Sequence, residues 1–284
     1  MAGSPSKVQS SYHVRSNSLP SRPHPVTSEV DQHLSRLRSS QASSTTSSSS
    51  ICHEINGLQD LHDCVDKLLQ LPLIQRAFGQ EQQKKWVDEL LNGSLRILDV
   101  SSIAKDALMQ TKECAQGLQS VLRRRRGDEI SSEVKKYLSS RKSVKKTIKK
   151  ALKGMEHKCS SKIDEEHEAV IILREVEAVT FTVFESLLSL ISGPKASSNS
   201  GWSLVSKLIQ SKRIACEEEE TSANEFAKLD AALSTLTCKS DNIICVQNQL
   251  KELESSIENL EEVIECLSRH LIKSRVSLLN ILDN

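Results

Sequence analysis

The sequence is poor in aromatic residues, glycine and proline. Of its 284 residues, 3% are aromatic, nine are glycine and six are proline. An all-β sandwich or barrel of this length needs many more aromatic and turn-forming residues, so the composition argues against such a fold. The abundance of Leu, Ile, Val, Glu and Lys favours helices instead. We therefore predict an all-α protein.

The sequence also lacks the common signatures of catalysis and nucleotide binding. It contains no GxSxG, P-loop, GxGxxG or HExxH motif. Cys52, His53, His62 and Cys64 offer metal-binding atoms, but their spacing matches no usual zinc finger. On a helix these four side chains do not all share one face, whereas a structural zinc site needs closed tetrahedral geometry. We predict that the protein is not an enzyme and has no cofactor and no metal site.

The eight cysteines are not paired in sequence. None belongs to a CxxC motif, they fall singly along apolar helical faces, and no hydrophobic signal peptide precedes them. Such cysteines are typical of reduced thiols used as small core residues. We predict an intracellular protein that is cytoplasmic or peripheral to a membrane.

The first 50 residues differ in composition from the rest of the chain. They hold 17 serines and four of the six prolines, with almost no large apolar side chains. Such a segment buries too little apolar surface to offset the entropy lost on ordering, so we predict a disordered regulatory tail over 1–50. The serine-rich, acid-poor start also resembles a plastid transit peptide. We favour the tail because the arginines are few and a discrete motif is present.

That motif is the stretch "RSNSLP" at residues 15–20. Arg15, Ser18 and Pro20 fit the R-S-x-S-x-P peptide that 14-3-3 proteins bind once the serine is phosphorylated. Arg15 also suits a basophilic kinase, and the phosphate would add about −1.5 to −2 charge for an arginine cluster in the reader's groove. We therefore predict a phospho-dependent docking site for a 14-3-3 protein at Ser18.

Apolar periodicity predicts one helical domain over residues 51–284. The pattern indicates an amphipathic helix that ends near Pro72, a short helix that stops at Asn92-Gly93, and a longer helix from Ser94. The remaining predicted elements are a basic helix (128–158), a central apolar helix (163–192), a loop (193–201) and a coiled-coil-like helix (222–282). We predict an elongated bundle of these helices.

The central apolar segment is long enough to raise the question of a membrane span. Arg174, Glu175, Glu177 and Glu185 interrupt it, and charged residues in a lipid-facing helix are costly. A helix that is apolar nearly all round and carries a few charges is typical of the centre of a bundle.

The C-terminal helix has the clearest pattern in the chain. Apolar residues alternate three- and four-residue steps, as in a coiled coil. The flanking positions carry few of the charges that select a partner in a two-stranded coiled coil. We therefore favour packing within the chain's own bundle, with a homodimer as the alternative. The predicted packing or dimer seam comprises Leu250, Leu253, Ile257, Leu260, Ile264, Leu267 and Leu271.

Charge is segregated along the chain although the total is close to balanced. Residues 123–158 contain 14 Lys and Arg against four acids, a net of +10. Residues 217–284 contain 14 acids against six bases, a net of −8. Such segregation gives the surface opposite potentials in different places. The seven bases of the stretch 141–153 are Arg141, Lys142, Lys145, Lys146, Lys149, Lys150 and Lys153.

Three interpretations of this basic helix compete. Clustered lysines beside one apolar stripe suit an anionic lipid surface. A nucleic-acid surface is disfavoured, because only Tyr137 is aromatic and no nucleic-acid-binding motif is present. The third interpretation, which we favour, is that the stripe packs into the bundle while the lysines face the acidic C-terminal helix or water.

Six blocks of the chain resemble successive blocks of a plant-specific family that is grouped with the BYPASS proteins. They are "RSNSLPSRPHP", "LDVSSIAKDALMQTKECAQGLQSVLRRRR", "YLSSRKSVKKTIKKALKGM", "LREVEAVTFTVFESLLSLISGP", "WSLVSKLIQSKR" and "RHLIKSRVSLLNILDN". The resemblance implies an all-helical, non-enzymatic plant protein with a role in root and shoot development. It supplies no catalytic residues. We expect a regulatory or scaffold protein, with a peripheral membrane protein as the alternative.

Overall fold

The computed structural model describes residues 24–41, 47–79, 84–124, 127–155, 168–193, 224–236 and 240–283. Over these residues the all-α prediction is confirmed, since they form helices and no strand. The helices are α1 (Pro25–Gln41), α2 (Ser48–Leu69), α3 (Pro72–Phe78), α4 (Lys84–Arg124), α5 (Gly127–Met155), α6 (Glu168–Ser192), α8 (Glu225–Ser234) and α9 (Ser240–Asp283).

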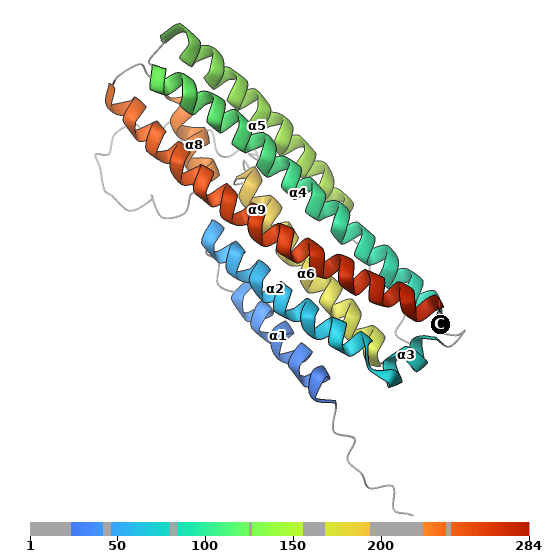
Figure 1. Cartoon of the computed structure of the whole chain (residues 1–284). Helices are drawn as coiled ribbons and strands as arrows, with labels where there is room; N and C mark the ends of the chain where they lie inside the picture. Colours follow the sequence, from blue (N-terminus) through green and yellow to red (C-terminus); the bar gives the residue numbers. More distant parts are fainter. Residues whose placement is uncertain are drawn as a thin grey trace, which may run out of the picture.

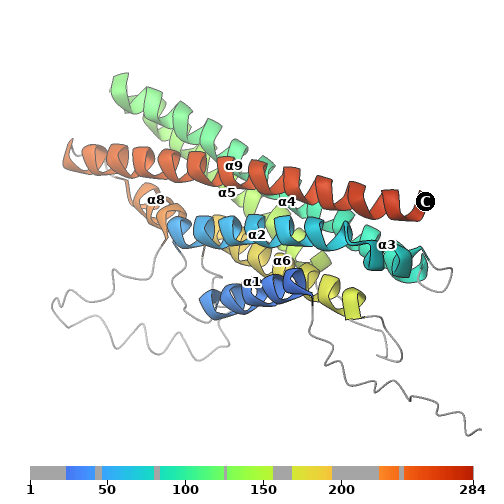
Figure 2. The ribbon, with the colours of Figure 1, turned by 60° about the horizontal axis from the view of Figure 1, so that its bottom comes forward.

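The long helices form an elongated bundle. α4 packs between α5 and α9, and these three helices run side by side along the length of the molecule (Figure 1). α2 packs on the other side of α9, and α1 covers α2 (Figure 2). α6 contacts α1, α2, α4, α5 and α8, so it is the central helix that the sequence predicted.

Local signals explain where several helices begin and end. Ser47 caps α2, because its side chain accepts a hydrogen bond from the Ser50 amide at 3.2 Å. Asn224 caps α8 in the same way, accepting from the Ala227 amide at 2.9 Å. α6 ends at Ser192, and the next residue, Gly193, has a φ of 77°, a conformation that glycine adopts without a steric cost.

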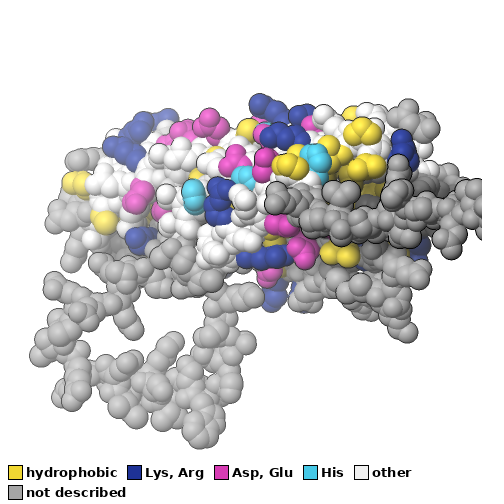
Figure 3. All heavy atoms as spheres, turned by 90° about the horizontal axis from the view of Figure 1, so that it is seen from below, with side chains coloured by type: hydrophobic (Ala, Val, Ile, Leu, Met, Phe, Trp, Pro, Cys, Tyr) yellow, Lys and Arg dark blue, Asp and Glu magenta, His cyan; other side chains and the backbone are white. Residues whose placement is uncertain are grey.

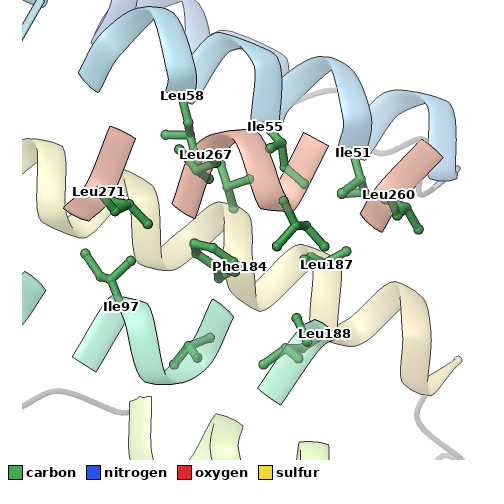
Figure 4. Packing of buried hydrophobic residues seen from close by; sticks show 14 of the residues in the cluster. Ile51, Ile55, Leu58, Ile97, Phe184, Leu187, Leu188, Leu260, Leu267 and Leu271 are labelled. Atoms are coloured by element: carbon green, nitrogen blue, oxygen red, sulfur yellow. The ribbon is translucent and has the colours of Figure 1, made fainter. Parts of the chain in front are cut away.

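The core forms where α6 meets the other long helices. Figure 4 shows Phe184, Leu187 and Leu188 of α6 between residues of α2 and α9 on one side and α4 on the other. All three are 0–1% exposed. Burial of such side chains contributes about 1.5–3 kcal/mol each before entropy is counted. Most of the surface of α6 therefore faces protein, and a narrower stripe that includes Ile171, Thr182 and Glu185 is exposed.

The prediction of a disordered tail is wrong for residues 25–41, which form α1. Val30, Leu34 and Leu37 lie at helical spacing and are 0–4% exposed against the bundle. Gly57 lets α1 approach α2 closely, because a Cβ there would come within 2.9 Å of Leu37 Cδ2. Packing of these three apolar residues against α2 and α6 stabilises α1. The serine-rich composition of the segment obscured their helical spacing.

The predicted helix stop at Asn92-Gly93 is also wrong, since α4 continues through both residues. Gly93 is buried where α4 faces α6, and a Cβ there would overlap the carboxylate of Glu177. The glycine therefore allows the close approach of another helix and does not break its own.

The coiled-coil-like helix predicted over 222–282 is divided into α8 and α9. α8 ends at Ser234 with Thr235 as its cap, and α9 begins at Ser240. α8 packs against α9. Leu229 is therefore buried, as its periodicity suggested, but on a separate helix.

Candidate functional site

A row of lysines lies on the outward face of α5. Val144 and Ile148 are 2% and 0% exposed, so this stripe packs into the bundle and the opposite side of the helix faces solvent. The row runs for about 16 Å at 1.5 Å per residue. Its members are exposed, and they are Lys142, Lys146, Lys149, Lys150 and Lys153. We call these five residues the lysine row.

Arg141, which we predicted to belong to this anionic-binding surface, is buried. Its side chain is 3% exposed, and its Nε donates to Asp230 Oδ1 of α8 at 3.1 Å. Its Nη2 donates to the Ile191 carbonyl at the end of α6 at 2.7 Å, and its guanidinium lies 5.3 Å from the centre of the Phe226 ring. Arg141 therefore joins three helices and is not available at the surface.

Lys145 is intermediate in exposure between the buried Arg141 and the exposed lysine row. Its Nζ is 2.8 Å from Asp230 Oδ2, and its side chain is 43% exposed. Asp230 thus pairs with two bases of α5, and it is an acid that the sequence did not single out. The signal available was only its position in the acidic C-terminal half, which gave no indication of burial.

Three acids of the C-terminal helix α9, which are Glu258, Glu261 and Glu265, form ion pairs with α4. Lys105 lies 2.9 Å from Glu265, and Lys112 lies 2.9 Å from Glu261. We expected the α5 lysines to face the acidic C-terminal helix or water. Lys145 meets Asp230 of α8, and the lysine row is exposed to water. Among the described residues, no acid forms an ion pair with a member of the lysine row.

The heptad seam lies inside the bundle. Its seven residues are 0–2% exposed, because α2, α4 and α8 of the same chain cover α9. Figure 4 shows Leu260, Leu267 and Leu271 of this seam directed toward residues of α2 and α6. The favoured prediction of packing within one chain agrees with this geometry, and the seam is not free to bind a second copy.

The other predicted sites divide between described and undescribed residues. Arg15, Ser18 and Pro20 lie outside the described residues. Among the described residues there is no group of three or more His, Cys, Asp or Glu side chains that could hold a metal ion. None of the described helices combines the length and the hydrophobicity that crossing a bilayer requires.

His62 has a structural role in the core. Thr180 donates its hydroxyl hydrogen to the Val176 carbonyl at 2.7 Å, so its oxygen accepts the proton of His62 Nε2 at 3.2 Å. Burial is the main cause that lowers the pKa of His62 to about 4, and nearby His270 adds to it. His62 is therefore a neutral core residue that links α2 to α6.

These features define a class of protein, an all-helical bundle with a basic outer helix and a buried heptad seam. A family model described as Protein BPS1 matches residues 54–281. Because the match spans more than half of the chain, the chain belongs to the BPS1 family, in agreement with the resemblance to BYPASS-related plant proteins. Membership suggests a plant developmental regulator. No curated protein and no solved structure gives a match to the chain.

Proposed function

We propose that this chain is a non-enzymatic regulatory or scaffold protein in plant root and shoot development that acts by binding other macromolecules at its outer surface. Family membership supports the developmental setting. The observation that carries the mode of action is the lysine row, which is exposed and forms no ion pair within the described part of the chain. The seam and most of the central helix are buried. Binding therefore falls to outer faces and to the N-terminal segment.

The N-terminal segment supplies the regulatory switch in this proposal. Ser18 precedes Pro25, the first residue of α1, by seven residues. Because α1 is docked on the bundle, a 14-3-3 protein bound at phosphorylated Ser18 would lie beside the folded domain. Phosphate adds about −1.5 to −2 charge and pairs with the reader's arginines.

The switch is tested with the full chain, phosphorylated by a basophilic kinase and titrated with purified 14-3-3 protein in a calorimeter. Ser18→Ala is expected to weaken binding more than about 10-fold, because it removes the charge-assisted contacts that the phosphate makes. Ser10→Ala removes a tail serine without a preceding arginine and is the matched control. Equal binding of Ser18→Ala and wild type would rule out the switch.

The lysine row favours a second candidate function, peripheral binding to an anionic membrane. All five members are lysines, which present hydrated point charges without the planar fork that arginine uses for bidentate contacts. No large hydrophobic residue of α5 is among the exposed ones. Such a row suits a diffuse anionic surface, to which each lysine contributes about 1 kcal/mol.

Vesicle flotation with about 20–30% anionic lipid tests this candidate. Replacing four members of the row, Lys142, Lys146, Lys149 and Lys153, with Gln is expected to lower partitioning by at least about 100-fold. The matched control replaces four exposed lysines elsewhere, Lys67, Lys85, Lys228 and Lys251, with Gln. Equal loss in both variants would show that only net charge matters and would eliminate the row as a site.

A further inference from the structure

A hollow of about 450 Å³ lies where α2, α8 and α9 meet. Binding sites for small molecules are clefts of about 300–1,000 Å³, so the hollow has room for a small organic ligand. Three serines, an asparagine and two glutamates line it beside Cys52 and Val263. A lining with this many polar groups suits a polar ligand that makes several hydrogen bonds.

Hydrogen bonds fix the inner end of the hollow. The Ser48 hydroxyl of α2 donates to Oε1 of Glu225, the first residue of α8, at 2.8 Å. The Ser48 oxygen also lies 3.2 Å from the Ser256 hydroxyl oxygen of α9. Ser48 is 6% exposed, so these contacts hold the Glu225 carboxylate in one position before any ligand binds.

Glu225 keeps an unused hydrogen-bond acceptor at this inner end. Its Oε2 is buried and accepts no hydrogen bond from the part of the chain that the structure describes. No described base forms an ion pair with this residue either. A carboxylate oxygen buried without a donor is unfavourable, and a ligand that brings an N–H donor to it would satisfy it.

Both charged residues in the lining are acids. Glu225 stands in the first turn of α8, where the positive end of the helix dipole stabilises a carboxylate. Glu262 is exposed on α9 and forms no ion pair among the described residues. Figure 3 shows acidic and basic side chains interspersed on the face seen from below, so the charge of that face is mixed. The hollow differs from it, because two carboxylates and no base act on one small volume, which favours a cation.

The two acids stand at different levels along α9. Ser256 marks the level of Glu225, because Ser48 contacts both residues. Glu262 follows six residues after Ser256, which places it about 9 Å further along the helix at 1.5 Å per residue. Asn259 lies midway between them in the lining. A cationic ligand that reaches both acids is therefore elongated and carries a positive group at each end.

We propose that the hollow binds a small aliphatic polyamine through an ammonium group at each end. An ammonium group carries three donors and no acceptor, so one would donate to the Glu225 carboxylate and the other to Glu262. The side-chain oxygen of Asn259 would accept a further hydrogen bond, and the methylene chain would lie against Val263. The proposal is independent of the lysine row and of the N-terminal switch.

The test is calorimetric titration of the full chain with three four-carbon probes that share a backbone and differ in charge. The probes are the diamine putrescine, the neutral alcohol butanediol and the dicarboxylate succinate. Putrescine is expected to bind saturably. The other two should bind at least about 10-fold more weakly, because butanediol lacks charge-assisted hydrogen bonds and both acids repel succinate.

Two variants connect this binding to the hollow. Glu225→Gln keeps an oxygen that can accept from Ser48 but removes the charge, and Glu262→Gln changes an exposed residue. Each is expected to bind putrescine at least about 10-fold more weakly, because one ion pair is lost. Glu113→Gln is the matched control, because Glu113 is exposed on α4, which does not line the hollow. Melting temperatures show whether each variant is folded.

Four results would overturn the proposal. The first is the absence of saturable putrescine binding to the wild type. The second is succinate or butanediol binding as tightly as putrescine, since the acids would then select no cation. The third is wild-type affinity for putrescine in Glu262→Gln. The fourth is an equal loss of affinity in Glu113→Gln and Glu262→Gln, which would show that only the net charge of the protein matters.

Discussion

Arg141 and Asp230 form an ion pair of 3.1 Å in which the arginine side chain is 3% exposed and the aspartate 14%. The same guanidinium caps the last turn of α6 through the Ile191 carbonyl. A base that belongs by sequence to the most basic stretch of the chain is therefore part of the core and fastens α8 to α5 and α6.

Removal of the acid should be costly because it leaves a charge buried without its partner. We expect Asp230→Ala to lower the free energy of unfolding by about 3–5 kcal/mol. Lys145→Gln removes the other, 43% exposed partner of Asp230 and should cost less than about 1 kcal/mol. Urea unfolding followed by circular dichroism measures both. Similar losses in the two variants would contradict the buried pairing of Arg141.

α1 should contribute to the stability of the bundle. Leu34 is 2% exposed between α1 and the rest of the core, and we expect Leu34→Ala to lower the free energy of unfolding by about 2–4 kcal/mol. Leu73→Ala is the control, because Leu73 is 74% exposed and its truncation should change stability by less than about 0.5 kcal/mol. If Leu34→Ala unfolds like wild type, α1 does not belong to the cooperative unit.

Stability should fall as the pH is lowered from about 6.5 to 4, and His62 should account for part of this fall. Its pKa is about 4 in the folded protein against 6.5 in the unfolded chain. Between these values the unfolded chain binds a proton that the folded protein does not, so acid favours unfolding. Above pH 6.5 both states are neutral and the effect vanishes. The full loss from this residue is about 3 kcal/mol.

The comparison that isolates His62 is the pH dependence of urea unfolding in wild type, His62→Gln and His53→Gln. His62→Gln should show a smaller slope across this pH window, whatever its stability at neutral pH. His53 is exposed, so His53→Gln should keep the wild-type slope. A wild-type slope in His62→Gln would mean that His62 is charged in the folded protein.

The heptad seam should act within one chain. Leu260 is 0% exposed, and we expect Leu260→Ala to lower the free energy of unfolding by about 2–5 kcal/mol. Because the seam contacts α2, α4 and α8 of the same chain, the substitution should leave the sedimentation coefficient of the folded protein unchanged. A shift from dimer to monomer on Leu260→Ala would indicate that the seam joins two copies.

The helical class and the buried stripes were readable from the sequence because they depend on local periodicity. The apolar stripes of α5 and α9 predict which face of each helix is buried, and the largely apolar sequence of α6 predicts that most of that helix is buried. Periodicity does not name the covering partner. Thus the pattern predicted that Leu260 is buried, but only the structure shows that α2, α4 and α8 cover the helix that carries it.

The features that the sequence did not predict have a common physical cause, since each depends on contacts between residues far apart in sequence. Arg141 is buried because Asp230 and the end of α6 meet it, 89 and 50 residues away. Position 93 is a glycine inside a continuous helix because Glu177 of α6 occupies the space that a side chain would need. The sequence by itself determined most of the helical segments and which of their faces are apolar, but not α1 or the break between α8 and α9. The tertiary structure alone decided which charges are paired in the interior and which remain on the surface to bind a partner.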